Sequence, residues 1–300
     1  MDNQIFPNYR PSHDRLVCID SDGCVFDTME IKHKECFCPS MIQIWGLQPI
    51  SKYAREAWEF ANLYSKDRGR SRFIDLVKTF DLLEDWDQVK AYHFSFPDTG
   101  SLRKWVADSP VLNQEALKGS RDPVLMRTLE WSLDCNRRIA EMVKGIPPFP
   151  GAGECIRELA EKADIAIVSA TARDALVREW EEHGLLSYVT ILCSQEEGSK
   201  SQCIEALKGH YSKDHILMMG DAPGDREAAH KNGALFYPIR PGEEMASWRE
   251  FSESKMECFL KGEYTRKEEA AQIVRFDQCL PEIPWWKRNK PAEKGFSAGI

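Results

Sequence analysis

A chain of 300 residues with 42% hydrophobic residues is long enough for one large domain or for a core with an inserted unit. Its formal net charge of −8 argues against a nucleic acid or an acidic membrane as the main partner. No stretch approaches the roughly 20 continuous apolar residues that cross a bilayer, and no secretory signal begins the chain. The ten cysteines are scattered. We therefore expect a cytoplasmic protein with reduced thiols.

The first apolar run, residues 15–20, is typical of a buried strand and ends in acidic residues. Because side chains alternate along a strand, Asp20 and Asp22 should point the same way just past its end. Two neighbouring carboxylates repel each other unless a cation lies between them. The pattern therefore predicts a hard divalent metal beside a nucleophilic carboxylate, and Gly23 lets the following turn bend and expose its amides to a phosphate.

Residues 29–146 have helical rather than alternating periodicity. Two apolar helical faces are expected to be buried. One is made by Phe73, Val77 and Phe80, and the other by Met126, Leu129, Leu133, Ala140 and Val143. The interior is expected to be filled by Trp45, Trp58, Trp86, Trp105 and Trp131. A basic run at 66–72 stands out in an acidic chain, and the guanidinium groups of Arg68, Arg70 and Arg72 are candidates for holding an anionic leaving group. Lys32, His33 and Lys34 are weaker candidates for the same cavity.

Further apolar strands are predicted at 164–169, 189–193, 215–220 and 234–239. They alternate with helices over 153–163, over 175–183 after a capping box at 171–174, and from Lys200 onward. Alternating strands and helices indicate a parallel sheet with crossover helices. Ligands of such sheets bind beyond the carboxyl ends of the strands, so residues that directly follow a strand are the candidates for the site.

Four motifs follow such ends or begin a helix: Asp20-Ser21-Asp22, then Ser169-Ala170, then Lys200, then Asp221 with Asp225. Their order resembles that of the haloacid dehalogenase superfamily of phosphatases and phosphotransferases, over roughly residues 13–28 and 147–240. The resemblance implies a Rossmann-like α/β core with a helical cap inserted after the first motif. We interpret residues 1–28 and 147–242 as the catalytic core, 29–146 as the cap, and 243–300 as a helical extension with a mobile tail. Helices are expected near 243–261 and 266–277, and Trp285 and Trp286 are expected to dock on the surface.

The expected chemistry is phosphoryl transfer, in which a protein mainly supplies a nucleophile, positioning and charge neutralisation. Asp20 is the candidate nucleophile that forms an aspartyl-phosphate, and Asp22 is the candidate general acid and base. Ser169 and the amide of Ala170 would donate hydrogen bonds to the phosphoryl oxygens, and Lys200 would neutralise their charge. Magnesium prefers oxygen ligands, and we expect it to bind Asp20, Asp221, the backbone carbonyl of Asp22 and, directly or through water, Asp225.

The leading interpretation is a magnesium-dependent phosphatase of a small soluble phosphorylated metabolite. A sugar-phosphate mutase on the same core stays open, since mutases keep the same motifs. A phosphonate hydrolase, which would need a Schiff-base lysine in the cap, and a non-catalytic binding protein of this fold are weaker alternatives. A dehalogenase is disfavoured because Asp22 is present, and the oligomeric state is left open.

Overall fold

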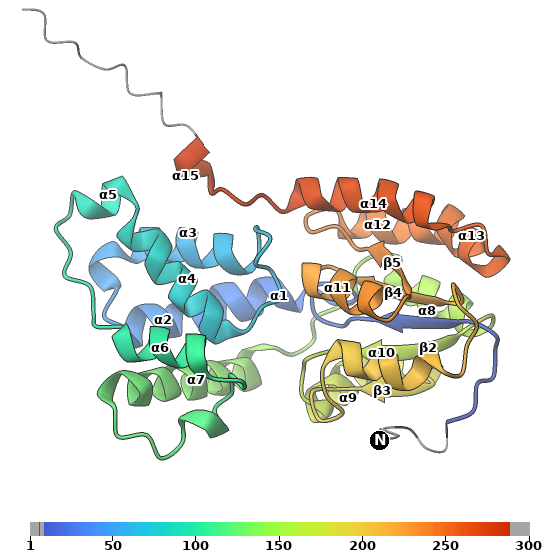
Figure 1. Cartoon of the computed structure of the whole chain (residues 1–300), viewed down its shortest axis with the longest axis horizontal. Helices are drawn as coiled ribbons and strands as arrows, with labels where there is room; N and C mark the ends of the chain where they lie inside the picture. The colour runs from blue at the N-terminus through green and yellow to red at the C-terminus, as the bar shows by residue number, and fades with distance from the viewer. Residues whose placement is uncertain (1–5, 7–8, 289–300) are drawn as a thin grey trace, which may run out of the picture.

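The computed structural model describes residue 6 and residues 9–288, in which a five-stranded sheet lies beside a helical unit (Figure 1). The strands are β1 (Leu16–Ile19), β2 (Asp164–Val168), β3 (Ile191–Cys193), β4 (Ile216–Gly220) and β5 (Leu235–Pro238). Their order across the sheet is β3-β2-β1-β4-β5, and every neighbouring pair is parallel. The predicted α/β fold with a parallel sheet is confirmed, and each predicted strand agrees with the observed one to within two residues.

Helices cover both faces of this sheet because its strands are apolar on both sides. In β1, β2, β4 and β5, side chains at odd positions, such as Val17 and Ile165, pack against one group of helices. Side chains at even positions, such as Cys18 and Ala166, pack against another. The first group is α8 (Ala152–Ala160), α9 (Arg173–Glu182), α12 (Glu244–Glu250), η5 (Phe251–Lys255) and α13 (Met256–Lys261). The second is α10 (Lys200–Lys208), α11 (Pro223–Lys231) and α14 (Arg266–Cys279). The short η4 (Leu186–Tyr188) precedes β3. The sheet therefore lies in the middle of three layers.

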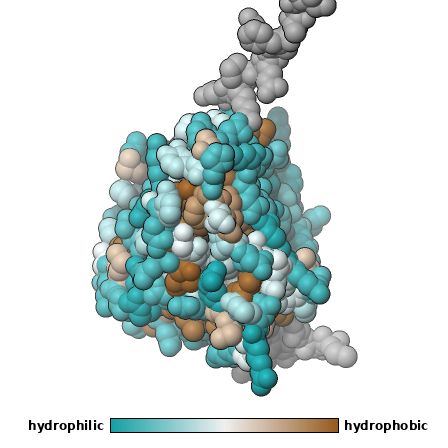
Figure 2. All heavy atoms as spheres, turned by 90° about the vertical axis from the view of Figure 1, so that its left-hand side faces the viewer, coloured by the Kyte–Doolittle hydropathy of each residue, from teal (hydrophilic) through white to brown (hydrophobic). Residues whose placement is uncertain are grey.

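Between β1 and α8 the chain forms a helical unit with its own apolar cluster, which we call the cap. Its elements are α1 (Thr28–Ile31), η1 (Lys32–Phe37), α2 (Cys38–Ile44), η2 (Gln48–Ile50), α3 (Ser51–Asn62), α4 (Arg72–Glu84), α5 (Asp87–Lys90), α6 (Gly100–Asp108), η3 (Glu115–Leu117) and α7 (Pro123–Met142). Trp45, Trp58, Trp86 and Trp131 fill its interior, whereas Trp105 is only partly buried. The cap end of the molecule is mostly hydrophilic outside, with small separate hydrophobic patches (Figure 2).

The prediction for the buried face of α7 is wrong in part. Met126 and Leu133 are about half exposed, and Ala140 is exposed as well. The buried stripe instead runs through Trp131 and Cys135. Both stripes repeat at helical spacing, so the apolar pattern fits either face. The indole of Trp131 decides between them because burying so large a ring among the cap aromatics removes more apolar surface from water.

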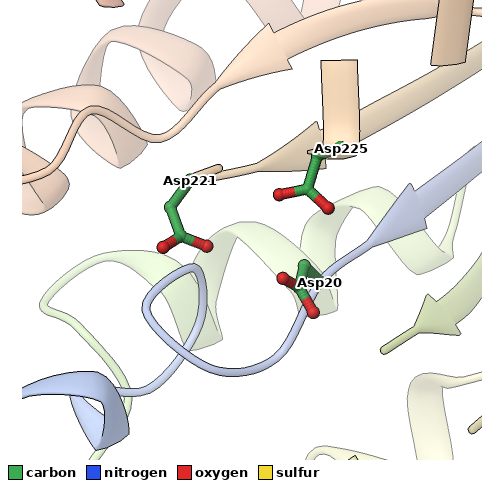
Figure 3. Close-up of side chains that lie close together, drawn as sticks. All are labelled: Asp20, Asp221 and Asp225. Carbon is green, nitrogen blue, oxygen red and sulfur yellow. The ribbon is translucent and has the colours of Figure 1, made fainter. Parts of the chain in front are cut away.

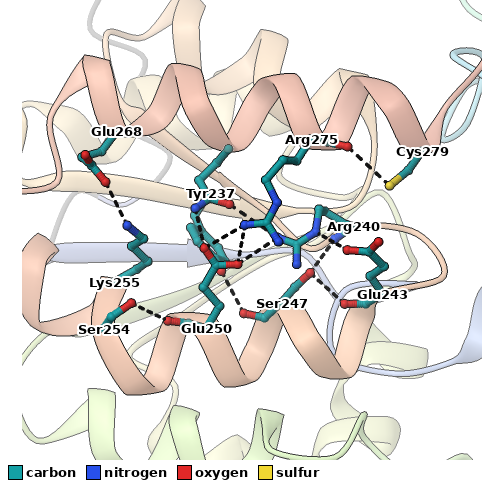
Figure 4. Close-up of polar contacts among 11 residues, drawn as sticks. Tyr237, Arg240, Glu243, Ser247, Glu250, Ser254, Lys255, Glu268, Arg275 and Cys279 are labelled. Atoms are coloured by element: carbon teal, nitrogen blue, oxygen red, sulfur yellow. Dashed lines mark hydrogen bonds and ion pairs between the residues drawn. The ribbon is translucent and has the colours of Figure 1, made fainter.

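A buried arginine fixes the helices that follow the sheet (Figure 4). Arg240, two residues after β5, donates to Glu243 over 2.8 Å and to Glu250 over 3.3 Å. Glu250 also accepts hydrogen bonds from Gln272 and Arg275 of α14. Because a buried charge is tolerated only when it is paired, this network ties α12 and α14 to the end of the sheet.

The chain then crosses from α14 to the cap and forms α15 (Trp285–Arg288) there (Figure 1). The ring of Trp286 stacks on Trp86 with the centroids 3.9 Å apart and the planes 4° from parallel. Lys287 also pairs with Asp85 of the cap. Trp285 is exposed, as expected for a residue docked on the surface, but Trp286 belongs to the cap cluster. The mobile tail that we expected falls on residues 289–300, outside the described residues.

Among residues 9–288, no helix combines the length and the apolar character that crossing a membrane requires.

Candidate active site

Three carboxylates that follow two neighbouring strands meet at the carboxyl edge of the sheet (Figure 3). Asp20 directly follows β1, Asp221 follows β4, and Asp225 lies in the first turn of α11. Each offers one oxygen to a group whose members all lie within 4.8 Å of one another, and each residue is almost fully buried. The strand ends are adjacent because β1 and β4 pair in parallel. Asp20 and Asp221, which are 201 positions apart in the sequence, thus share one site.

Two buried cations partly neutralise these carboxylates. Lys200 donates to Asp20 and Asp225, over 2.5 Å in each case, and Arg68 donates to Asp221 through Nε over 2.7 Å. Burial raises the pKa of Asp20 and that of Asp221 to about 6, against the lowering effects of Lys200 and Arg68 respectively. Burial would lower the pKa of Lys200, but its two aspartate partners raise it above its ordinary range. Three acids therefore face two cations.

Asp22 lies apart from this group, and its side chain is turned toward the cap. Its carboxylate accepts hydrogen bonds from Thr28, from Lys32 over 2.5 Å and from Thr171 over 2.8 Å. Burial acts to raise its pKa, but Lys32 and the two hydroxyls outweigh burial and lower it to about 2. Asp22 is therefore ionised in this arrangement. Its carboxylate is not part of the acidic group in Figure 3, so metal ligation through its backbone carbonyl stays a prediction.

The predicted capping box at Thr171 is wrong. Helix α9 begins at Arg173 with Ala172 as its N-cap, and no side chain caps it. The hydroxyl of Thr171 instead donates to Asp22. A hydrogen bond to an ionised carboxylate is stronger than one between the hydroxyl and a backbone amide at the helix end. The predicted helix start at Lys200 is confirmed, with Ser199 and Gln202 forming the capping box there.

A cavity of about 520 Å³ opens between the sheet edge and the cap. Its wall on the sheet side includes Asp20, Asp22, Ser169, Ala170 and Lys200. The structure thus brings together the residues that we expected to bind a phosphoryl group, around a space large enough for a small metabolite.

Gly23 has no room for a side chain. Its φ is +76°, in the region that glycine adopts without strain. A Cβ atom there would lie 2.4 Å from Asp221 Oδ2 and 2.6 Å from Arg68 Nη2. The glycine therefore allows the turn after β1 to approach both the carboxylate group and the cap.

The three arginines of the basic run have different surroundings. Arg68 is buried on Asp221 and is not part of the cavity wall. Arg70 lines the cavity, but it is exposed and pairs with Asp67 over 2.6 Å. Arg72 also lines the cavity and donates to Asn136 over 2.7 Å. Substrate binding by Arg68, Arg70 and Arg72 stays a prediction.

Several residues of the cavity wall were not anticipated from the sequence. Glu179 of α9 is buried near Lys32, at 3.9 Å, and burial raises its pKa to about 7 despite this lysine. Asn62 and Asp75 come from the middle of the cap, and both are 1% exposed. Of the weaker candidates, Lys32 and His33 line the cavity. Glu179, Asn62 and Asp75 lie inside ordinary helical patterns, which carry no signal for a site.

Comparison with known proteins gives one family match. Residues 123–238 match the model of a family described as haloacid dehalogenase-like hydrolase. This segment runs from α7 to β5 and contains Ser169, Lys200, Asp221 and Asp225, but neither Asp20 nor Asp22. The predicted resemblance is confirmed by this match. No curated protein matches the chain.

Solved structures of the same superfamily resemble the chain at low identity. A hydrolase of this superfamily from Geobacter sulfurreducens is 16% identical, with a TM-score of 0.41 over 76% of this chain and 89% of its own. A haloacid dehalogenase-like hydrolase from Streptococcus pneumoniae is 12% identical, with a TM-score of 0.40 over 78% and 90%. The protein YfnB from Bacillus subtilis, solved with bound magnesium, is 13% identical, with a TM-score of 0.39 over 75% and 86%.

Proposed function

We propose that this chain is a haloacid dehalogenase-like hydrolase and releases phosphate from a small phosphorylated metabolite. The observation that carries the proposal is the placement of Asp20, which lies at the end of a central strand, contacts Lys200 and opens into the cavity. A carboxylate that attacks phosphorus needs a neighbouring cation and a space for the ester, and this position has both.

We propose Mg²⁺ as the cofactor because the donors present fit a hard cation. One oxygen of Asp221, Oδ1, is buried and has no hydrogen-bond partner among the described residues. Carboxylate oxygens are the ligands that magnesium prefers. Asp20, Asp221 and Asp225 would hold the ion, with the backbone carbonyl of Asp22 as a further ligand. When bound, the ion would neutralise charge on the phosphoryl group.

In the proposed reaction Asp20 attacks phosphorus and becomes an aspartyl-phosphate, which water then hydrolyses. Ser169 and the amide of Ala170 donate hydrogen bonds to the phosphoryl oxygens, and Lys200 balances their charge. Dividing hydrolysis into two steps requires one group that protonates the leaving oxygen and later accepts a proton from water. We assign both tasks to Asp22.

The surroundings of Asp22 suit the second of these tasks directly. Lys32, Thr28 and Thr171 keep the carboxylate ionised, so it can accept a proton from the attacking water. To donate a proton in the first step, Asp22 must have a higher pKa. Because Lys32 belongs to the cap, movement of the cap away from the sheet would remove this cation and raise the pKa of Asp22. Asp22 would then take up a proton while the cap is open and donate it after the cap has closed on the substrate.

A screen of phosphorylated metabolites, with magnesium or with a chelator, tests the proposal by phosphate release. Asp20→Asn should abolish turnover, whereas Asp14→Asn, an exposed change at the opposite edge of the sheet, should not affect it. Activity that survives Asp20→Asn would exclude the mechanism. Isomerisation of a sugar phosphate without net phosphate release would favour the mutase, and borohydride trapping of a cap lysine would favour the phosphonate hydrolase.

We also propose the division of the chain into a core of residues 1–28 and 147–242, a cap of 29–146 and an extension from 243. The separate apolar clusters of the sheet and of the cap support it. The cytoplasmic location stays a prediction.

A further inference from the structure

The cap side of the cavity contains three buried polar atoms that have no hydrogen-bond partner among the described residues. They are Oδ1 of Asn62, Oδ1 of Asp75 and Nδ1 of His33, and all three residues line the cavity. A buried polar atom without a partner costs free energy. Three such atoms on one wall are therefore available to bond with a ligand in the cavity.

The same wall carries an arginine without an acidic partner. The guanidinium of Arg72 lies over the ring of Phe37, 4.7 Å from its centroid, and donates to Asn136 and to Ser132. All of these partners are uncharged, and no carboxylate of residues 9–288 forms an ion pair with Arg72. The residue is also the first of helix α4, whose N-terminus favours an anion.

The other cations of the basic run are already paired with carboxylates. Arg68 pairs with Asp221, Arg70 with Asp67 and Lys66 with Glu282. Arg72 is therefore the member of this run with a charge left for a ligand, and its planar fork matches a carboxylate or a phosphate.

The chemistry of the unpaired atoms indicates which groups of a ligand they can bond to. Asn62 Oδ1 is an acceptor, because the Nδ2 atom donates to the carbonyl of Trp58 over 2.9 Å. Burial, followed by Arg68 and Arg72, lowers the pKa of His33 to about 3, so its ring is neutral. Burial raises the pKa of the Asp75 carboxyl well above its ordinary value, which favours its uncharged form. Uncharged donors and acceptors of this kind match the hydroxyl groups of a ligand.

Building on the proposed phosphatase activity, we propose that the leaving group of the substrate carries a second anionic group, which Arg72 binds, and at least one hydroxyl, which bonds to Asn62, His33 or Asp75. The second anion is a carboxylate or a phosphate. The substrate class is thus a hydroxylated phosphomonoester with two anionic ends, one at Asp20 and Lys200 and the other at Arg72.

Matched substrate pairs test this proposal, since their members differ only in the second anion. Phosphoglycerate and glycerol phosphate compare a carboxylate with a neutral alcohol, and fructose bisphosphate and fructose monophosphate compare a second phosphate with a hydroxyl. The wild-type enzyme should favour the charged member of at least one pair by about tenfold or more in kcat/KM, the value of one charged hydrogen bond. The pair that shows this preference identifies the anion.

Substitution of the arginine tests its role. Arg72→Gln should remove the preference within that pair and leave kcat/KM of the neutral member within about threefold, whereas Arg72→Lys should restore part of the preference. Arg137→Gln, an exposed change on α7 of the cap, is the control and should keep it in full. Equal use of both members in both pairs by the wild type, or an equal loss for both members in Arg72→Gln, would overturn the proposal.

Binding to the Asp20→Asn protein separates this inference from the proposed function. In calorimetry with the full chain, the charged member should bind at least about tenfold more tightly than the neutral one, and Arg72→Gln in the same background should abolish the difference. If no ester is hydrolysed but this difference is present, the proposed function fails and the inference stands. If phosphate is released but no binding difference exists, the inference fails and the proposed function stands.

Discussion

The contact between Arg68 and Asp221 connects the cap to the carboxylate group, and its removal should make the stability of the protein depend on a divalent cation. Both side chains are almost fully buried, at 3% and 2% exposure. Arg68→Gln removes one of the two cations that face three acids. The uncompensated carboxylate of Asp221 then becomes the best available ligand for an added cation.

The loss of stability expected for Arg68→Gln follows from the burial of the ion pair between Arg68 and Asp221. Removing one partner of a buried ion pair costs about 3–5 kcal/mol, which corresponds to a Tm lower by roughly 5–8 °C for a chain of this size. A cation that binds only the folded protein stabilises it according to its concentration relative to Kd. We therefore expect millimolar Mg²⁺ to raise the Tm of Arg68→Gln by several degrees more than that of the wild type.

Thermal unfolding with excess chelator and with Mg²⁺, followed by calorimetry, measures both effects. Arg103→Gln is a matched control, because Arg103 pairs with Asp81 and Glu84 on the exposed side of the cap, and exposed pairs contribute about 1 kcal/mol or less. The reasoning is refuted if Arg68→Gln loses stability but responds to Mg²⁺ no more than the wild type does.

Three further changes have defined outcomes. Lys32→Met should raise the pKa of Asp22 from about 2 and shift the acid limb of the phosphate-release profile to higher pH; an unshifted limb would separate Asp22 from the proton transfer. Burial raises the pKa of Glu179 from 4.5 to about 7, so the stability that this group contributes below pH ~5 is lost as the pH rises to ~8. Over that range the free energy of unfolding of Glu179→Gln, measured by urea titration, should therefore rise relative to that of the wild type by up to ~3 kcal/mol. Trp286→Ala removes the ring stacked on Trp86 and should cost roughly 3 kcal/mol; an unchanged denaturation midpoint would show that the contact contributes nothing.

The position of the acidic group could be predicted from the sequence because each acid follows or lies near the end of an apolar run. Parallel pairing of these runs leaves their ends little freedom, so Asp20 and Asp221 meet at one edge. Lys200 could be located because the sequence predicts a helix that begins there, and the structure confirms this start, which a capping box of Ser199 and Gln202 stabilises. The roles of these residues remain predictions.

The cap side of the site could not be predicted in the same way. Arg68 and Arg72 belong to one basic run, yet one contacts Asp221 and the other lines the cavity. Only the path of the loop before α4 separates them, and no periodic pattern encodes that path. Asn62 and Asp75 lie in regular amphipathic helices. Whether their side chains line the cavity depends on how the cap packs against the sheet.

The segment after α14 gives the chain a third connection between sheet and cap, besides those near Asp27 and Phe149. Residues 280–284 can span only about 17 Å when fully extended. If the two bodies separate, this short tether keeps Trp286 near its site on Trp86, at an effective concentration that reaches the millimolar range for short linkers. Re-docking is then an intramolecular event, and the range of cap opening is set by the length of this tether as well as by the connections near Asp27 and Phe149.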